Sequence, residues 1–320
     1  MFKLLLTMVM AVSAAPTLHA QEAWPSRPIK FIVPTPPGGP TDQVARVLAD
    51  KLATALGQPI VVDNRAGAGH LVGMTATAQS APDGYTFGIV STPLVVSPAL
   101  HAKMPYDTAR DLVPVSLLTN QPLIMVTRGA APYKTVRDVV AAAKAKPRSL
   151  NMASPGSATG PHLAGELLNT VSGMQVTHVP YKGGPQATLA TVSGETDFYF
   201  DTPNSSLPLI RDGRLRALAV SSPARMAALP DVPTVAESGF AGYDFNSFIG
   251  LVAPRGVPPA VLARLQSEIA KSMVLPDVKS RLTTSGFESV GGTSQDFATM
   301  IAAELPKWRK VVTEAKITAE

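Results

Sequence analysis

The stretch from residue 29 to residue 46 most constrains how this chain can fold, because it predicts a buried strand, a rigid loop and a helix start in direct succession. Residues 29–33 form a β-branched apolar run that is typical of a buried strand. The loop contains Gly38 and Gly39, which carry no side chains, and prolines limit its movement. Pro40 suits the first helical position, so the sequence predicts backbone N–H donors at a helix N-terminus, an arrangement that binds anions.

The same pattern of strand, loop and helix start occurs twice more along the chain. Residues 150–154 predict a strand before a Gly-Pro helix start at 160–161, and another short strand precedes Gly-Gly-Pro at 183–185. Ser157 and Thr159 would add hydroxyl groups to the second loop. Each of these elements, taken alone, is more often an ordinary strand-to-helix turn. Together they indicate three helix N-termini that could serve one ligand.

Composition limits the class of protein. With 320 residues, 45% of them hydrophobic and only 16% charged, the chain can bury a large core in two domains. Its 30 prolines lie at strand ends and helix starts, which indicates short connections between ordered elements. The chain contains no cysteine, so disulfides, thiolate metal sites, cysteine nucleophiles and a lipid-modified cysteine anchor are excluded.

Residues 1–20 have the features of a secretory signal peptide. Lys3 precedes an apolar core that is too short to span a bilayer, and small residues lead to Ala20. We therefore expect the mature protein to begin near Gln21, outside the cytoplasm. Loss of Lys3 lowers the formal charge from +5 to +4, because residues 1–20 contain no acid. This mild positive balance favours small anions, and the absence of a long Lys/Arg run argues against nucleic acid.

Strand and helix signals alternate along the mature chain and predict two α/β lobes. Residues 112–128 have the length and apolarity of two strands, and residues 245–252 predict a return strand. We therefore expect the first lobe to contain residues 21–122 and 245–320, and the second lobe residues 123–244. Two crossing segments would join these lobes.

The sequence favours a binding protein over an enzyme. G-x-S-x-G is absent, and His162 and Glu166, four residues apart on a predicted helix, lack a third metal ligand. The glycines of residues 67–73 imitate a dinucleotide fingerprint, but the first strand already carries its own loop. We predict no metal and no cofactor. A hydrolase using Ser154 or Ser157 with His162 is the alternative from another class.

Motifs spread in order over nearly the whole mature chain carry a family resemblance. The segments are WPSRPIKFIVPTPPGGPTD (24–42), VVDNRAGAG (61–69), PDGYTF (82–87), MPYD (104–107), ASPGSATGPHLAGEL (153–167), VPYKGGPQA (179–187), GRLRALAVSS (213–222) and GLVAPRGVPP (250–259). They resemble the Bug, or TctC-like, extracytoplasmic solute receptors of the tripartite tricarboxylate transporter system.

The resemblance implies an α/β fold of the two-lobed periplasmic binding protein type (type II-like), with two crossing segments and an interlobe ligand cleft. It implies a periplasmic, monomeric, non-enzymatic receptor that delivers a small carboxylate to integral membrane transporter subunits. The ligand stays open among di- or tricarboxylates, amino-dicarboxylates and aromatic acids. A sensor that presents its ligand to a signalling system is the alternative within binding proteins.

The resemblance also suggests ligand-binding residues. In such receptors, backbone amides and ordered waters at the first loop hold one ligand carboxylate, and residues of the second lobe recognise the other end of the ligand. The candidates are Thr35, Pro37, Gly38, Gly39, Asp42, Asn64, Ser91 and Thr92 on the first lobe, Ser154, Ser157, Thr159 and His162 on the second, and Asp201 near the hinge.

Four positions bear on which acid is bound. Thr35, His70 and Phe248 depart from the family's usual residues, which leaves the fold intact but affects ligand identity. Asp201 would oppose a second ligand carboxylate unless it is turned away or faces an ammonium or hydroxyl group.

Overall fold

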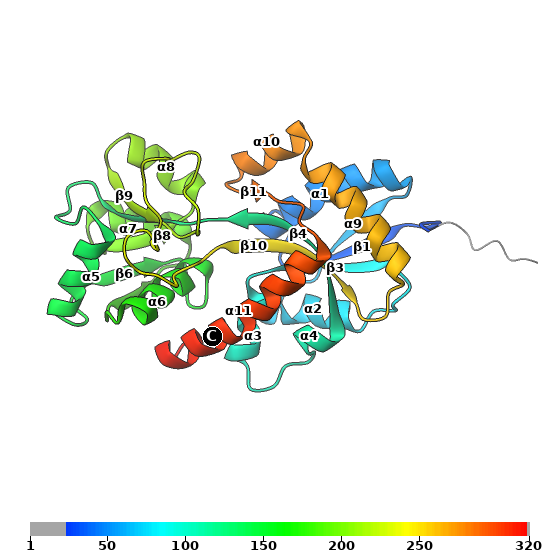
Figure 1. Cartoon of the computed structure of the whole chain (residues 1–320), viewed down its shortest axis with the longest axis horizontal. Coiled ribbons are helices and arrows are strands. Elements are labelled where there is room, and N and C mark those ends of the chain that lie inside the picture. Colours follow the sequence, from blue (N-terminus) through cyan, green and yellow to red (C-terminus); the bar gives the residue numbers. More distant parts are fainter. Residues whose placement is uncertain (1–23, 319–320) are drawn as a thin grey trace, which may run out of the picture.

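The computed structural model describes residues 24–318 as an α/β protein with two lobes (Figure 1). The predicted signal peptide, residues 1–20, lies outside the described residues. Within the described part, one lobe contains a six-stranded sheet of order β11-β4-β10-β3-β1-β2, and the other a five-stranded sheet of order β7-β6-β8-β5-β9. The strands are β1 (Ile29–Val33), β2 (Ile60–Asn64), β3 (Thr86–Ser91), β4 (Leu112–Gln121), β5 (Ile124–Arg128), β6 (Asn151–Ser154), β7 (Thr177–Pro180), β8 (Phe198–Asp201), β9 (Leu215–Val220), β10 (Ser247–Pro254) and β11 (Glu288–Ser289).

Helices cover both sheets (Figure 1). Around the first sheet lie α1 (Pro40–Leu56), η1 (Ala68–His70), α2 (Leu71–Ala78), α3 (Pro93–Leu100), α4 (Thr108–Asp111), α9 (Pro259–Met273), α10 (Pro276–Thr284) and α11 (Ser294–Ala315). Around the second lie α5 (Val136–Ala145), α6 (Gly160–Ser172), α7 (Gly184–Ser193) and α8 (Pro203–Arg211).

The three predicted strand, loop and helix-start units are confirmed as β1–α1, β6–α6 and β7–α7. In α1, Val44, Leu48 and Leu52 recur at helical spacing and are buried. Gly57 then ends the helix in the left-handed conformation, and its N–H donates to the Ala53 carbonyl at 3.0 Å. Because β1 runs parallel to β2 and β3, the loops after these strands meet at one edge of the sheet.

Two crossing strands connect the lobes. β4 and β10 pair antiparallel along their length, from Leu112 opposite Pro254 to Gln121 opposite Ser247. We propose that the lobe boundaries fall where the sequence predicts them, after residue 122 and before residue 245, because β5 and β9 already pair in the second sheet.

One buried serine ties both crossing segments to the second lobe. The Ser221 Oγ accepts a hydrogen bond from the Leu123 N–H and donates one to the Phe245 carbonyl, both at 2.8 Å. The Ser221 N–H also donates to the Leu123 carbonyl at 2.8 Å, and the Phe245 N–H donates to the Ser221 carbonyl at 3.0 Å. This side chain therefore fixes where the two crossings enter the second lobe.

Helix α11 makes a further connection between the lobes. It packs on α3 and β4 of the first lobe and reaches α6 of the second (Figure 1). The Trp308 ring on α11 packs edge-on against Phe245 with ring centroids 5.8 Å apart. One cluster of buried side chains consequently runs from Val95 on α3 through Trp308 to Leu163 on α6.

We predict that Ser221→Ala lowers the free energy of unfolding by at least about 2 kcal/mol, because it leaves two buried backbone groups without partners. Urea denaturation of the two proteins measures this difference. Ser193→Ala, on the exposed surface of α7, is the matched control and should change stability by less than about 0.5 kcal/mol. Equal stabilities of the two variants would contradict the role given to Ser221.

Candidate ligand-binding cleft

The loop between β1 and α1 leaves a helix N-terminus without a side-chain cap. Gly38 adopts a positive φ of 83°, a conformation that favours glycine. Gly39 is the N-cap residue and Pro40 follows as the first helical residue, and no side chain caps α1. The first N–H groups of α1 are therefore left for solvent or a ligand anion. Pro37 lies exposed on the same loop.

Asp42 supports this loop from within the protein. Its side chain is 2% exposed, and its Oδ2 accepts hydrogen bonds from the Gly38 N–H at 2.9 Å and the Arg46 Nε at 2.8 Å. Its Oδ1 accepts one from the Asn64 Nδ2 at 2.9 Å. Burial raises the pKa of Asp42, but the hydrogen bonds from Arg46, Gly38 and Asn64 outweigh it and bring the pKa below its usual value. The carboxylate stays charged and is committed to protein donors.

The structure corrects the expectation that both glycine N–H groups are free donors. The Gly38 N–H is taken by Asp42, which leaves Gly39 and the first turn of α1. The Asn64 Nδ2 also donates to the Thr35 carbonyl at 3.0 Å, so the Asn64 amide holds the loop in place. The Thr35 Oγ1, in contrast, is buried and has no hydrogen-bond partner among the described residues. It is thus a polar atom of the loop that a bound ligand could satisfy.

Two hydroxyl groups lie at the end of β3. The Ser91 Oγ is 3.4 Å from the Nδ1 of His70, and burial lowers the pKa of His70 to about 4, so this ring is neutral at pH 7. The Thr92 Oγ1 is 3.1 Å from the Oγ of Ser247, at the start of the crossing strand β10. A Cβ placed on Gly160 would lie 3.7 Å from the same Ser247 Oγ. The first lobe's hydroxyls therefore approach the start of α6 in the second lobe.

The β6–α6 loop satisfies most of its own polar groups. The Ser154 Oγ is fully buried, lies 2.6 Å from the His178 Nε2 and accepts the Gly156 N–H at 3.1 Å. The Thr159 Oγ1 donates to the Gly156 carbonyl at 2.7 Å. The histidine beside Ser154 is thus His178 and not His162, and a fully buried hydroxyl cannot attack a substrate. These contacts remove the basis for a Ser154–His162 hydrolase.

His162 shapes the same loop. Its Nδ1 accepts the Ala158 N–H at 3.0 Å, so this nitrogen carries no proton, and its Nε2 lies 3.5 Å from the Glu166 Oε1. The ring stacks on His178 with centroids 3.7 Å apart. Ala158 is held at a φ of +56°, a conformation that few residues other than glycine adopt. His162 therefore positions the loop, and its contact with a ligand stays a prediction.

Asp201 points into the second lobe. It is 1% exposed, and its carboxylate accepts the Thr188 Oγ1 hydrogen bond at 2.9 Å and the Thr202 N–H at 2.7 Å. Burial raises the pKa of Asp201 to about 6, although these hydrogen bonds oppose the rise. The carboxylate is turned away from solvent, which relieves the conflict with a second ligand carboxylate expected from the sequence.

A cavity of about 350 Å³ lies between the lobes. Of the residues predicted to bind the ligand, Ser157 lines it. Its walls are Ala68, Gly69, Pro93, Val96, Ser97, Leu100 and His101 from the first lobe, and Ser157 and Ala158 from the second. The η1 segment packs beside the β1–α1 loop, because Gly73 at the start of α2 directly abuts the Pro34 backbone. No residue of the β1–α1 loop itself is among those that line this cavity.

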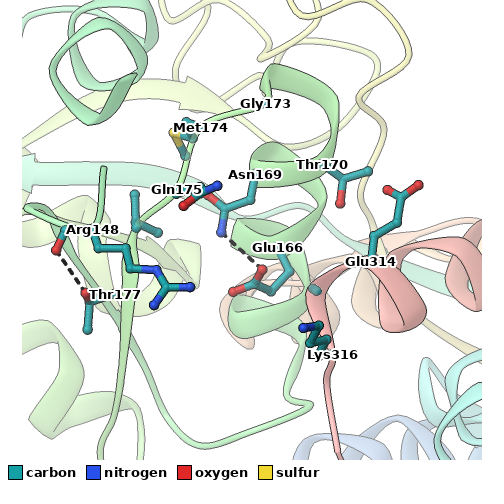
Figure 2. A pocket seen from close by; sticks show the side chains of 12 residues that line it. Arg148, Glu166, Asn169, Thr170, Gly173, Met174, Gln175, Thr177, Glu314 and Lys316 are labelled. Atoms are coloured by element: carbon teal, nitrogen blue, oxygen red, sulfur yellow. Dashed lines mark hydrogen bonds between the residues drawn. The ribbon is translucent and has the colours of Figure 1, made fainter. Parts of the chain in front are cut away.

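A larger cavity of about 580 Å³ lies elsewhere, between α6 and the C-terminal end of α11 (Figure 2). It is lined by side chains of both charges, including Arg148, Glu166, Glu314 and Lys316. The Asn169 Nδ2 donates to the Glu166 Oε2 at 3.1 Å across this wall (Figure 2). None of the predicted ligand residues lines it, and no uncapped helix start opens into it. We therefore propose that the ligand binds in the smaller cavity between the lobes.

The sequence reasoning missed the wall formed by α3. The sequence analysis assigns no helix to residues 93–101, whereas the structure has α3 there, with Pro98 inside the helix. The i, i+3 and i+4 spacing of Pro93, Val96, Ser97 and Leu100 is the signal that indicates one helical face. Among residues 24–318, no helix is long and apolar enough to cross a membrane, and no group of three His, Asp or Glu side chains is suited to a metal ion.

Two lobes, two crossing strands and a cavity at the loops between them define a solute-binding protein of the periplasmic type. The model of the tripartite tricarboxylate transporter family receptor (TctC) matches residues 44–317. The chain is also 37% identical over 303 residues to Protein BugT of Bordetella pertussis (strain Tohama I), which covers 94% of this chain and 92% of BugT. The chain therefore belongs to the TctC family of periplasmic receptors, as its motifs predict, and it is a binding protein and not an enzyme.

Solved structures share the fold. A TctC solute binding protein from Polaromonas has a TM-score of 0.84 at 26% identity, covering 91% of this chain and 99% of that chain. An R. palustris protein with adipate has a TM-score of 0.74 at 32% identity, covering 92% and 99%. MatC from Rhodopseudomonas palustris with bound malate has a TM-score of 0.72 at 32% identity, covering 90% and 100%.

We predict that Asp201→Asn changes the pH dependence of stability. The folded-state pKa of about 6 exceeds the unfolded value of about 3.9, so between these values the folded state holds a proton that the unfolded state has lost. The free energy of unfolding of the wild type should therefore fall by about 2 kcal/mol relative to Asp201→Asn as pH rises from about 4 to about 6. Urea denaturation across this range measures the difference, with the exposed Asp212→Asn as control. Parallel profiles for the wild type and Asp201→Asn would contradict the buried, protonated carboxyl.

Proposed function

We propose that this chain captures a small carboxylate in the cleft between its lobes and delivers it to the integral membrane subunits of a tripartite tricarboxylate-type transporter. Residues 1–20 would direct it to the periplasm and be removed near Gln21, and the mature chain would act as a monomer. The relatives whose structures contain adipate and malate support a carboxylate ligand.

One observation carries this proposal: α1 and α6, one in each lobe, both start without a side-chain cap, and the loop before α6 lines the cavity between the lobes. No side chain caps α1 or α6, whereas α5 and α11, at other places, are capped by Thr135 and Thr293. Uncapped N–H groups and the positive helix end bind a carboxylate without a buried cation. Helices α2, α3, α7, α8, α9 and α10 also start without side-chain caps, so an uncapped start alone does not mark the site.

The predicted ligand residues divide into two roles in this proposal. Contact with the ligand would come from the N–H groups at Gly39 and the start of α1, and from hydroxyls beside the cleft. Those hydroxyls are Thr35, Ser91, Thr92 and Ser157. Support would come from side chains that hold the loops, namely Asp42, Asn64, Ser154, Thr159 and His162.

Closure of the lobes would complete the site. Hinge motion about the crossing strands would press the Ser157–Ala158 loop onto a ligand held at the β1–α1 loop. Burial of the carboxylate between two helix ends strengthens each hydrogen bond, because little water remains to compete. A membrane partner would then recognise the closed form.

We predict that Gly39→Val abolishes carboxylate binding and leaves the fold nearly intact. Gly39 has a φ of −71°, and a Cβ there would meet only the Pro36 carbonyl at 3.5 Å and the Thr35 Oγ1 at 3.9 Å. The valine side chain would nevertheless occupy the space in front of the α1 N–H groups. Isothermal titration calorimetry with the acid that binds the wild type measures the loss.

The matched control for this variant is Gly292→Val, where a Cβ would have similar contacts, at 3.5 Å from the Val290 Cγ1, far along the chain from the loop. Wild-type affinity in a folded Gly39→Val protein would rule out the β1–α1 loop as the anion site.

A further inference from the structure

The wall that α3 contributes to the interlobe cavity is apolar. Pro93, Val96 and Leu100 lie on one face of the helix, and Ala68 and Gly69 of η1 continue the surface. No Lys, Arg, Asp or Glu is among the residues that line this cavity. A ligand that fills it therefore meets hydrocarbon over much of its body, and burial of apolar ligand surface there is favourable.

The wall offers few polar partners. Ser97 is 4% exposed, lines the cavity, and its hydroxyl makes no hydrogen bond to another residue of the part of the chain that the structure describes. His101 and Ser157 are the other polar side chains of the lining. A ligand with several hydroxyl groups along its body would leave most of them buried without partners, which carries a large desolvation cost.

Charge near the cleft is equally sparse. Burial keeps the pKa of His70 at about 4, so this ring carries no charge at neutral pH. Arg46, beside the anion loop, is committed to Asp42 and Asn64 at 2.8 and 3.2 Å. A ligand carboxylate can therefore be held by a helix N-terminus, but no free cationic side chain lines the cavity. A third carboxylate on the ligand would have no partner, so binding of a tricarboxylate is disfavoured.

We propose that the ligand is a carboxylate with an unsubstituted hydrocarbon body, either an aliphatic chain or a ring, and not a hydroxylated di- or tricarboxylate. Its carboxyl group lies at the uncapped helix ends, and its body lies against Pro93, Val96 and Leu100. Ser97 supplies a hydrogen bond to one polar group at the far end. This inference rests on the proposed carboxylate receptor and narrows its ligand class.

Matched pairs of acids test the proposal by isothermal titration calorimetry on the mature protein. Adipate is compared with galactarate, its tetrahydroxy derivative, and cyclohexanecarboxylate with quinate, which carries hydroxyls on the same ring. At least one hydrocarbon acid should bind at least about tenfold more tightly than its hydroxylated partner, the cost of one or more unpaired hydroxyls. Equal or tighter binding of the hydroxylated member of each pair would overturn the proposal.

A substitution on α3, in the apolar wall of the cavity, provides a second test of the proposal. Leu100→Gln should weaken binding of the preferred hydrocarbon acid at least about fivefold, because it places an amide on the apolar wall. Leu189→Gln, at a residue of α7 that is 62% exposed, is the same change outside the cavity and should leave affinity unchanged. Thermal melts confirm that both variants fold. Unchanged affinity in a folded Leu100→Gln protein would overturn the placement of the ligand body on α3.

The outcomes separate this inference from the proposed function. If galactarate and quinate each bind at least as tightly as their hydrocarbon partners, and this binding is lost in Gly39→Val, the carboxylate receptor stands and the apolar ligand class is overturned. Absence of binding by every acid tested would overturn both.

Discussion

The structure of the cleft depends on the buried carboxylate of Asp42. By accepting hydrogen bonds from Gly38, Arg46 and Asn64, it fixes the β1–α1 loop and keeps Arg46 out of the site. A buried charge is tolerable only when it is fully paired, and here the pairing lies within the protein, behind the loop. The front of the loop is left with backbone donors and the positive end of α1, so that an anion can bind without competing for a salt bridge.

The second lobe follows the same principle with different residues. His162 and Ser154 satisfy the β6–α6 loop from behind, and Ser157 is left at the cavity. In our proposal, backbone groups bind the carboxylate, and the side chains of α3 contact the rest of the ligand. Helix α11 contacts both lobes. Closure of the cleft would therefore either slide α11 along α6 or move α11 together with one lobe as a rigid body.

Much of the fold could be predicted from local sequence, because Gly-Pro helix starts after apolar strands are encoded within a few residues. The β1–α1, β6–α6 and β7–α7 units are of this kind, and the crossing strands β4 and β10 are likewise visible as local apolar runs, although their pairing joins distant segments. Side-chain direction could not be predicted. An aspartate such as Asp42 or Asp201 looks the same in the sequence whether its carboxylate faces a ligand or the protein interior. The wall of α3 and the reach of α11 to α6 also depend on packing between distant segments, which periodicity alone does not reveal.

We propose that helix N-termini hold a carboxylate without help from a cationic side chain. The most direct test is a thermal-shift comparison of acids with their own amides. The mature protein, freed of any copurified ligand, is melted with each acid and with the corresponding amide, because a ligand that binds only the folded state raises the melting temperature. If the helix ends hold a carboxylate, an acid should stabilise the protein and its amide should not. Equal stabilisation by an acid and its amide would contradict this claim. Absence of stabilisation by every acid tested would also contradict it.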